Sequence, residues 1–150
     1  LISGGRAGGL AAMIEPTGGL TTFFWVMLLD YILAFAAIGL AGFAPKFVKN
    51  VPAALAVGAV IGLLGRYLCH FLSGFFLFSG YAEWFFGDQV PWGGWFLETF
   101  HGNALSAVYS LIYNGLYMVP EIIITAVGGL LIGGVLKSQL MKNRTNPFLS

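Results

Sequence analysis

The sequence predicts an all-α fold, a polytopic bundle of transmembrane helices, and three observations support it. The chain is 58% hydrophobic with a mean hydropathy of +0.85, and only 9% of its residues are charged. A soluble domain of this size has too much surface to carry so few charges. The apolar residues form runs that can cross a hydrocarbon core about 30 Å thick, which takes roughly 20 helical residues. These runs do not alternate apolar with polar residues, as the strands of a membrane barrel do.

We expect a single transmembrane domain. Residues 1–14 are apolar but begin without an initiator Met, a basic segment or a signal-peptide cleavage site, so we interpret them as the end of a span that is cut short. The elements expected in chain order are a partial helix at 1–14, helices at about 21–44, 51–79 and 104–141, an outer loop at 80–103 and a cytoplasmic tail at 142–150.

The run at 104–141 contains Pro120 near its middle and, as one helix, overshoots the hydrocarbon considerably. Two short helices broken at Pro120 would place the C-terminal tail on the other side of the membrane. The basic character of the tail argues against that placement. We therefore expect one long helix, kinked or loosened near Pro120.

The basic residues set the expected orientation. They include Lys46 and Lys49 after the first helix, and Lys137, Lys142 and Arg144 near the C-terminus. The connection at 80–103 carries Glu83, Asp88 and Glu98 but no Lys or Arg. Cytoplasmic loops of membrane proteins are enriched in Lys and Arg, so the turn and the tail are predicted to be cytoplasmic and the connection to lie outside.

Two glycine pairs, Gly58–Gly62 and Gly129–Gly133, have the GxxxG spacing. Small residues four apart let two membrane helices approach closely, and close helix packing is the expected role of both pairs.

Asp30 lies in an otherwise uncharged apolar run. A charge at bilayer depth costs about 3 kcal/mol or more, so it is normally kept only where it meets a partner or a ligand. In the predicted orientation Asp30, His70, Tyr109 and Asn114 lie at similar depth in the outer half of three helices. We expect them to line one cavity open to the outside.

The polar residues of the last helix fall on one face, since Ser110, Asn114, Tyr117 and Glu121 recur at i, i+4, i+7 and i+11. A carboxylate, an imidazole, an amide and phenols with aromatic walls suit a small, flat, cationic heteroaromatic ligand.

Three motifs carry a family resemblance: LLDYILAFAAIGLAG at 28–42, GRYLCHFLSGFFLF at 65–78 and YSLIYNGLYMVPE at 109–121. In this order and spacing they resemble the thiamine-specific substrate-binding component (S-component) of bacterial energy-coupling factor (ECF) vitamin transporters, the ThiT/YuaJ family. The resemblance implies a six-helix fold, truncated here at its N-terminus, in the bacterial cell membrane. It implies capture of thiamine, vitamin B1, from outside, without cofactor, metal or catalysis. The implied partners are a transmembrane scaffold subunit and two ATPase subunits that drive uptake.

The same resemblance implies the substrate-binding residues. The family's acidic residue falls on Asp30, followed by an aromatic at Tyr31, and its histidine falls on His70. Its tyrosine and asparagine fall on Tyr109 and Asn114. These groups would hold the aminopyrimidine by hydrogen bonds and the thiazolium by stacking and charge.

A stacking Trp of some members is replaced here by Phe78, and Trp84 is a second source of that ring contact.

The residues alone leave other interpretations open. Asp30 could be a structural partner of Arg66, and His70 could donate to a backbone carbonyl. Arg66 is more readily placed as an orienting group than as a contact to a cationic ligand, because like charges repel. The role of Glu121 stays open.

Three other function classes compete. A small structural subunit of a membrane assembly would explain the GxxxG faces but not the clustered polar groups. A membrane enzyme would use Asp30 with His70 and His101, but the sequence has no HExxH, no GxSxG and no cysteine pair. A stand-alone ion- or proton-coupled transporter is the main alternative, since intramembrane acids and histidines also serve as proton relays. The sequence has no glycine-rich phosphate loop, so ATP hydrolysis is assigned to a partner.

Overall fold

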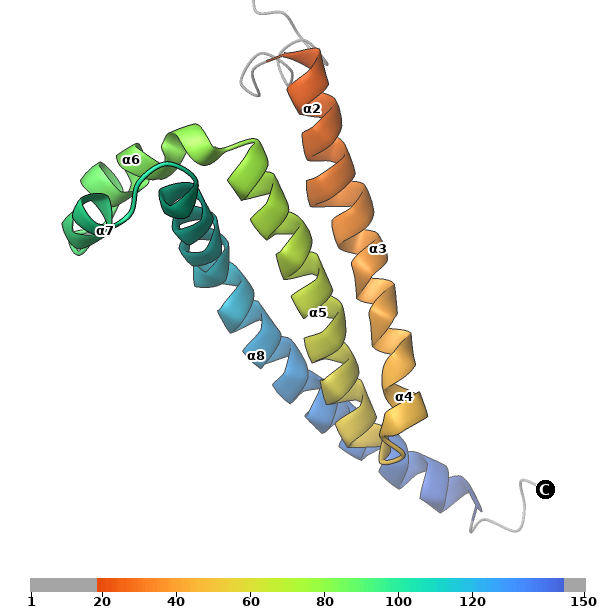
Figure 1. Cartoon of the computed structure of the whole chain (residues 1–150). Coiled ribbons are helices and arrows are strands. Elements are labelled where there is room, and N and C mark those ends of the chain that lie inside the picture. Colours follow the sequence, from red (N-terminus) through yellow and green to blue (C-terminus); the bar gives the residue numbers. More distant parts are fainter. Residues whose placement is uncertain (1–18, 145–150) are drawn as a thin grey trace, which may run out of the picture. The chain divides into compact units, whose positions relative to one another are not determined.

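The computed structural model describes residues 19–144, and every regular element in that range is a helix (Figure 1). Three helices within it are long and apolar enough to cross a membrane: Leu20–Phe47, Val51–Phe76 and Asn103–Gln139. The all-α transmembrane class predicted from composition is confirmed. The partial helix expected at 1–14 and the last residues of the tail lie outside the described residues.

The first membrane helix runs without interruption but changes its hydrogen-bonding type along its length. Its segments are α2 (Leu20–Val26), a π-helix η2 (Met27–Leu33), α3 (Ala34–Ile38), a 3-10 helix η3 (Gly39–Phe43) and α4 (Ala44–Phe47). Asp30 sits at the centre of the π segment. A π turn holds one more residue than an α turn, and such turns occur frequently at functional sites.

The second membrane helix is α5 (Val51–Phe76), and its N-terminus is capped by Asn50. The Asn50 side-chain Oδ1 accepts a hydrogen bond from the Ala53 backbone N–H at 3.3 Å, which satisfies one of the open donors of the first turn. Pro52 is tolerated beside it, because an N–H at this position has no partner within the helix.

The third membrane helix, α8 (Asn103–Arg144), is a single helix with Pro120 inside it. The structure therefore has one long helix here and not two helices broken at the proline. Gly102, directly before α8, has φ +54°, a left-handed conformation that glycine adopts without strain.

The segment expected as an outer loop at 80–103 contains several short helical elements, and its position outside the membrane stays a prediction. It contains a 3-10 helix η4 (Ser79–Tyr81), α6 (Ala82–Trp84), a π-helix η5 (Phe85–Gln89) and α7 (Gly94–Thr99). We call residues 79–100 the aromatic hairpin. It folds because its rings pack on one another: Phe86 is buried and stacks on Phe96, with ring centroids 4.8 Å apart and planes 10° apart.

The described chain divides into two compact units. The first unit comprises residues 19–33 and 69–111, and the second comprises residues 34–68 and 112–144. Each unit therefore contains a part of each of the three membrane helices.

In the second unit, Gly58 and Gly62 of α5 lie against the first membrane helix. A Cβ at Gly58 would lie 2.9 Å from the Ala41 carbonyl oxygen, and a Cβ at Gly62 would lie 2.9 Å from that of Ile38. These distances are too short for a side chain, so the backbones touch directly. The close packing predicted from this GxxxG pair is confirmed.

The other GxxxG pair packs α8 on the start of α5. A Cβ at Gly129 would lie 3.1 Å from the Ala56 backbone N, and one at Gly133 would lie 2.5 Å from the Pro52 Cα. This contact places the C-terminal part of α8 beside the turn that precedes α5. The turn with Lys46 and Lys49 and the part of α8 that follows Gly133 therefore lie at the same end of the second unit. The side of the membrane that this end faces stays a prediction.

Candidate functional site

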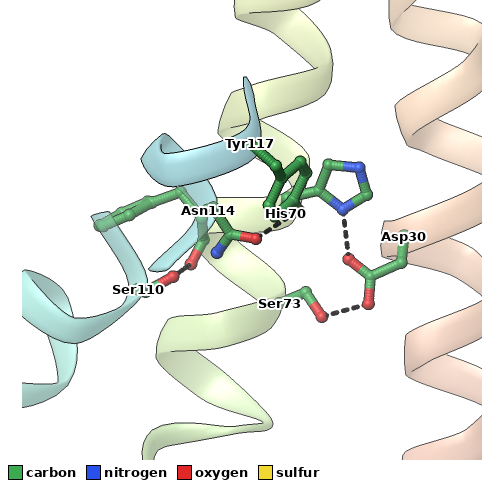
Figure 2. A network of polar contacts seen from close by, with 7 residues as sticks. Asp30, His70, Ser73, Ser110, Asn114 and Tyr117 are labelled. Carbon is green, nitrogen blue, oxygen red and sulfur yellow. Dashed lines mark hydrogen bonds and ion pairs between the residues drawn. The ribbon is translucent and has the colours of Figure 1, made fainter. Parts of the chain in front are cut away.

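The first unit contains a cluster of three polar side chains in which His70 and Ser73 contact the Asp30 carboxylate (Figure 2). His70 Nδ1 lies 2.8 Å from Asp30 Oδ1, and the Ser73 hydroxyl donates to Asp30 Oδ2 at 2.6 Å. The side chains of His70 and Asp30 are 11% and 19% exposed, and Ser73 is 1% exposed. Each carboxylate oxygen therefore has its own hydrogen-bond partner in a largely enclosed position.

The helical spacing on α5 explains how two donors reach one carboxylate. His70 and Ser73 are three residues apart, and residues at i and i+3 lie on the same face of a helix. The pairing of Asp30 with His70 joins two residues that the sequence singled out. Ser73 was missed, although its spacing from His70 was a signal that could have identified it.

The hydrogen-bond pattern fits an ionised carboxylate. An ionised carboxylate only accepts hydrogen bonds, so His70 must carry a proton on Nδ1 in order to donate to Asp30. In the neutral imidazole the other nitrogen, Nε2, is then an acceptor. Charge-assisted hydrogen bonds of this kind offset part of the cost of holding a charge in apolar surroundings.

Tyr109 is at the start of α8 and is buried in the first unit. Its ring meets the Phe85 ring edge-on, with centroids 5.5 Å apart. The next residue, Ser110, is fully buried and donates to the Phe71 carbonyl oxygen at 2.6 Å. This bond fixes the start of α8 on α5, so Ser110, one member of the predicted polar face, has a structural contact.

The side chains of the aromatic residues proposed for ring contacts are partly exposed. Tyr31, adjacent to Asp30, is 52% exposed. Phe78, Tyr81 and Trp84 form a chain of ring contacts, with centroids 6.2 Å apart between the first two and 6.3 Å apart between the last two.

The second unit contains Asn114, which is buried and accepts a hydrogen bond from the Tyr117 hydroxyl at 2.6 Å. Because Asn114 and Asp30 belong to different units, a cavity shared by the two stays a prediction.

The second unit also pairs Arg66 with Glu121. Arg66 Nη1 lies 2.6 Å from Glu121 Oε1, and the guanidinium carbon lies 5.6 Å from the centre of the Phe35 ring. The sequence singled out both charged residues but did not suggest that they pair.

Asp30 is in the lining of neither of two hollows found among the described residues. One, of about 530 Å³, is lined mainly by apolar residues around the turn between the first two membrane helices. The other, of about 350 Å³, includes Glu83 and His101 in its lining. Within residues 19–144, no group of three His, Cys, Asp or Glu side chains is placed to hold a metal ion.

The chain has three membrane-length helices and is a multi-pass membrane protein. Two of these helices contribute the cluster of carboxylate, imidazole and hydroxyl groups, so a polar cluster lies within the apolar spans. The family model described as thiamine transporter protein (Thia_YuaJ) matches residues 1–87. The chain belongs to this family, as its motifs indicated. It is a protein of the bacterial cell membrane.

A curated relative supports the assignment. The chain is 36% identical to the thiamine transporter ThiT of Bacillus subtilis (strain 168) over 112 residues, which is 67% of this chain and 48% of the relative. The chain thus spans about half the length of that protein. No solved structure matches the chain.

The family match covers only part of the site proposed from the motifs. Asp30 and His70 fall within residues 1–87, together with the first two motifs. Tyr109 and Asn114 follow this range, so their assignment depends on the third motif.

Proposed function

We propose that this chain belongs to a high-affinity thiamine-binding membrane subunit, the S-component of an ECF transporter, which captures vitamin B1 from outside the cell. Membership of the thiamine transporter family supports this proposal. The single observation that carries it is the Asp30 carboxylate, which two donors hold within a membrane-spanning helix. A charge in this position is costly unless it has a functional or structural role.

The carboxylate matches the chemistry of thiamine in two ways. Thiamine has a positively charged thiazolium ring, which the negative charge of Asp30 would offset. It also has an aminopyrimidine with N–H donors. A carboxylate has about four acceptor positions on its two oxygens, and His70 and Ser73 use one on each. The remaining positions would accept hydrogen bonds from the aminopyrimidine.

The fixed conformation of the Asp30 side chain favours tight binding. Because His70 and Ser73 already orient Asp30, little further ordering of this side chain is needed when the ligand arrives. The exposed ring of Tyr31, together with Phe78 and Trp84, would stack on the thiazolium, since aromatic faces attract cations.

Tyr109 and Asn114 complete the proposed substrate-binding set. The Asn114 amide has both donor and acceptor groups for the aminopyrimidine. The two residues lie on one helix, five positions apart.

Uptake would depend on partners: a transmembrane scaffold subunit and two ATPase subunits that drive release into the cytoplasm. Family membership indicates a transporter, and we propose that the chain performs no catalysis of its own.

The test is a titration of the full-length protein in detergent, monitored by tryptophan fluorescence. Thiamine should change the fluorescence with tight, saturable binding and without ATP, whereas riboflavin should not. Thiamine phosphates, titrated in parallel, establish whether phosphorylated forms are accepted. Equal affinity for thiamine and for an analogue without the aminopyrimidine would contradict the proposed roles. Thiamine uptake by the subunit alone in vesicles, driven by a proton gradient, would support the alternative of a stand-alone coupled transporter.

A further inference from the structure

The aromatic hairpin has surface features that thiamine binding does not explain. It joins the end of α5 to the start of α8, two helices that can each span a membrane. Chain continuity therefore puts the hairpin at a membrane surface. Its charged residues are the acids Glu83, Asp88 and Glu98, and because it has no Lys or Arg, the positive-inside rule predicts that this surface lies outside the cell.

The hairpin is a folded element with its own small core. The Gly93 N–H donates to the Val90 carbonyl at 3.0 Å and closes the turn. A side chain at Gly93 would collide with the Phe86 backbone, so the backbones of η5 and of the start of α7 touch directly. Trp92 and Phe96 pack on the Phe86 ring from within the hairpin.

The hairpin is also anchored to a membrane helix in the first unit. Phe85 is buried and its ring contacts the Tyr109 ring of α8. The hairpin is therefore held at the point where the helix leaves the membrane.

Large aromatic side chains on this folded element nevertheless remain exposed. Trp92 is 49% exposed and Trp95 is 59% exposed, although both contact the Phe96 ring. Indole rings left in water lose the favourable free energy of burial. Trp is enriched at membrane–water interfaces, where its ring lies among the headgroups and its N–H keeps a polar partner.

We propose that the aromatic hairpin docks on the lipid bilayer itself, with Trp92 and Trp95 in the boundary between headgroups and acyl chains of the outer leaflet. The three acids oppose attraction to anionic lipids, so apolar insertion and not charge would hold the hairpin in place. The docking would be independent of thiamine.

The experiment measures the depth of single tryptophans in the full-length protein, reconstituted in phosphatidylcholine vesicles. One variant keeps Trp92 and another keeps Trp95, with Trp25, Trp84 and any other tryptophan changed to Phe. Lipids carry a spin-label quencher on the headgroup, at a shallow acyl position or near the acyl end. Both tryptophans should be quenched severalfold more by the headgroup and shallow labels than by the deep label.

The matched control carries Ile124→Trp in a background without other tryptophans, because Ile124 is an exposed residue near the middle of the α8 span. Its tryptophan should be quenched best by the deep label, which establishes that depth is resolved. Adding anionic lipid or salt should leave the pattern of Trp92 and Trp95 unchanged.

Quenching of Trp92 and Trp95 by aqueous iodide, with none by any lipid label, would overturn the proposal. Shielding from iodide that appears only when thiamine is added, again without lipid quenching, would also overturn it and would identify a lid over the ligand. A failure of thiamine binding leaves the depth measurement unaffected, so the two proposals are tested separately.

Discussion

Arg66 and Glu121 form an ion pair between α5 and α8, with Nη1 and Oε1 2.6 Å apart, within the apolar length of both helices. The Arg66 and Glu121 side chains are 22% and 35% exposed. Phe35 places its ring near the guanidinium, so Arg66 links all three membrane-helix segments of the second unit. Each charge makes it less costly to keep the other in an apolar span.

The first prediction concerns this pair. Changing Glu121 to Gln leaves the Arg66 charge without its carboxylate and should destabilise the protein by about 1–3 kcal/mol. Thermal unfolding in detergent measures the loss.

A double-mutant cycle with Arg66→Leu and Glu121→Leu provides the control. The double variant should lose less stability than the sum of the single losses, because it leaves no uncompensated charge. Losses that simply add would show that the two charges are not energetically coupled.

The second prediction concerns the Asp30 charge. Asp30→Asn keeps the shape of the side chain but removes its negative charge, and should weaken thiamine binding by about 2 kcal/mol or more if the carboxylate contacts the ligand. Fluorescence titration gives the dissociation constant. Asp88→Asn, which changes an exposed acid of the aromatic hairpin, is the control and should bind as the unchanged protein does. Equal affinities for all three proteins would remove Asp30 from the site.

The third prediction concerns Ser73, which holds one oxygen of the Asp30 carboxylate. Ser73→Ala should weaken thiamine binding by about 1 kcal/mol, because the carboxylate loses a donor that orients it. Ser106→Ala is the matched control, since that hydroxyl donates to the exposed Gly102 carbonyl at 3.2 Å and does not contact Asp30.

A fall in affinity that also appears with Ser106→Ala would count against a specific role for Ser73. An unchanged thermal stability of Ser73→Ala, measured in the same preparation, separates the loss of orientation from a loss of folding.

The fourth prediction concerns helix packing at Gly133. A Cβ there would lie 2.5 Å from the Pro52 Cα, so Gly133→Ala must force backbones apart and should destabilise the protein by about 1–3 kcal/mol. Gly134→Ala is the control, because a Cβ at Gly134 has no atom within 4 Å. That change should be neutral or should stabilise α8 by about 0.5–1 kcal/mol, since Ala favours helix over Gly. Equal thermal midpoints for the two variants would contradict the packing argument.

Part of the site was predictable because it depends on local pattern. An acid in an apolar run and a histidine in the next helix indicated Asp30 and His70 as candidate site residues. Their contact required the rotation of each helix about its axis, and the π segment around Asp30 alters that rotation. Hydropathy carries no information on such a local change of helix type, so the partners of the carboxylate came only from the structure.

The helices of the aromatic hairpin were not predictable from a local sequence pattern. Its helices are short, and the turn around Gly93 separates them. A helical repeat of apolar residues is recognised only over a longer segment, so the sequence does not show one here. These short helices are too short to be stable by helix propensity alone, so the packing of Phe86 on Phe96 is needed to stabilise them.

The amino-acid sequence by itself determined the class of this protein. Backbone N–H and C=O groups cannot bond to water inside hydrocarbon, so apolar runs of membrane-spanning length form helices that satisfy these groups internally. It also determined where those helices pack closely, since only glycine permits backbone contact at Gly62 and Gly133. Tertiary structure alone decided which polar groups meet. The pairing of Arg66 with Glu121, and of Asp30 with Ser73 as well as His70, depends on helix rotation and register, which many weak packing contacts set together.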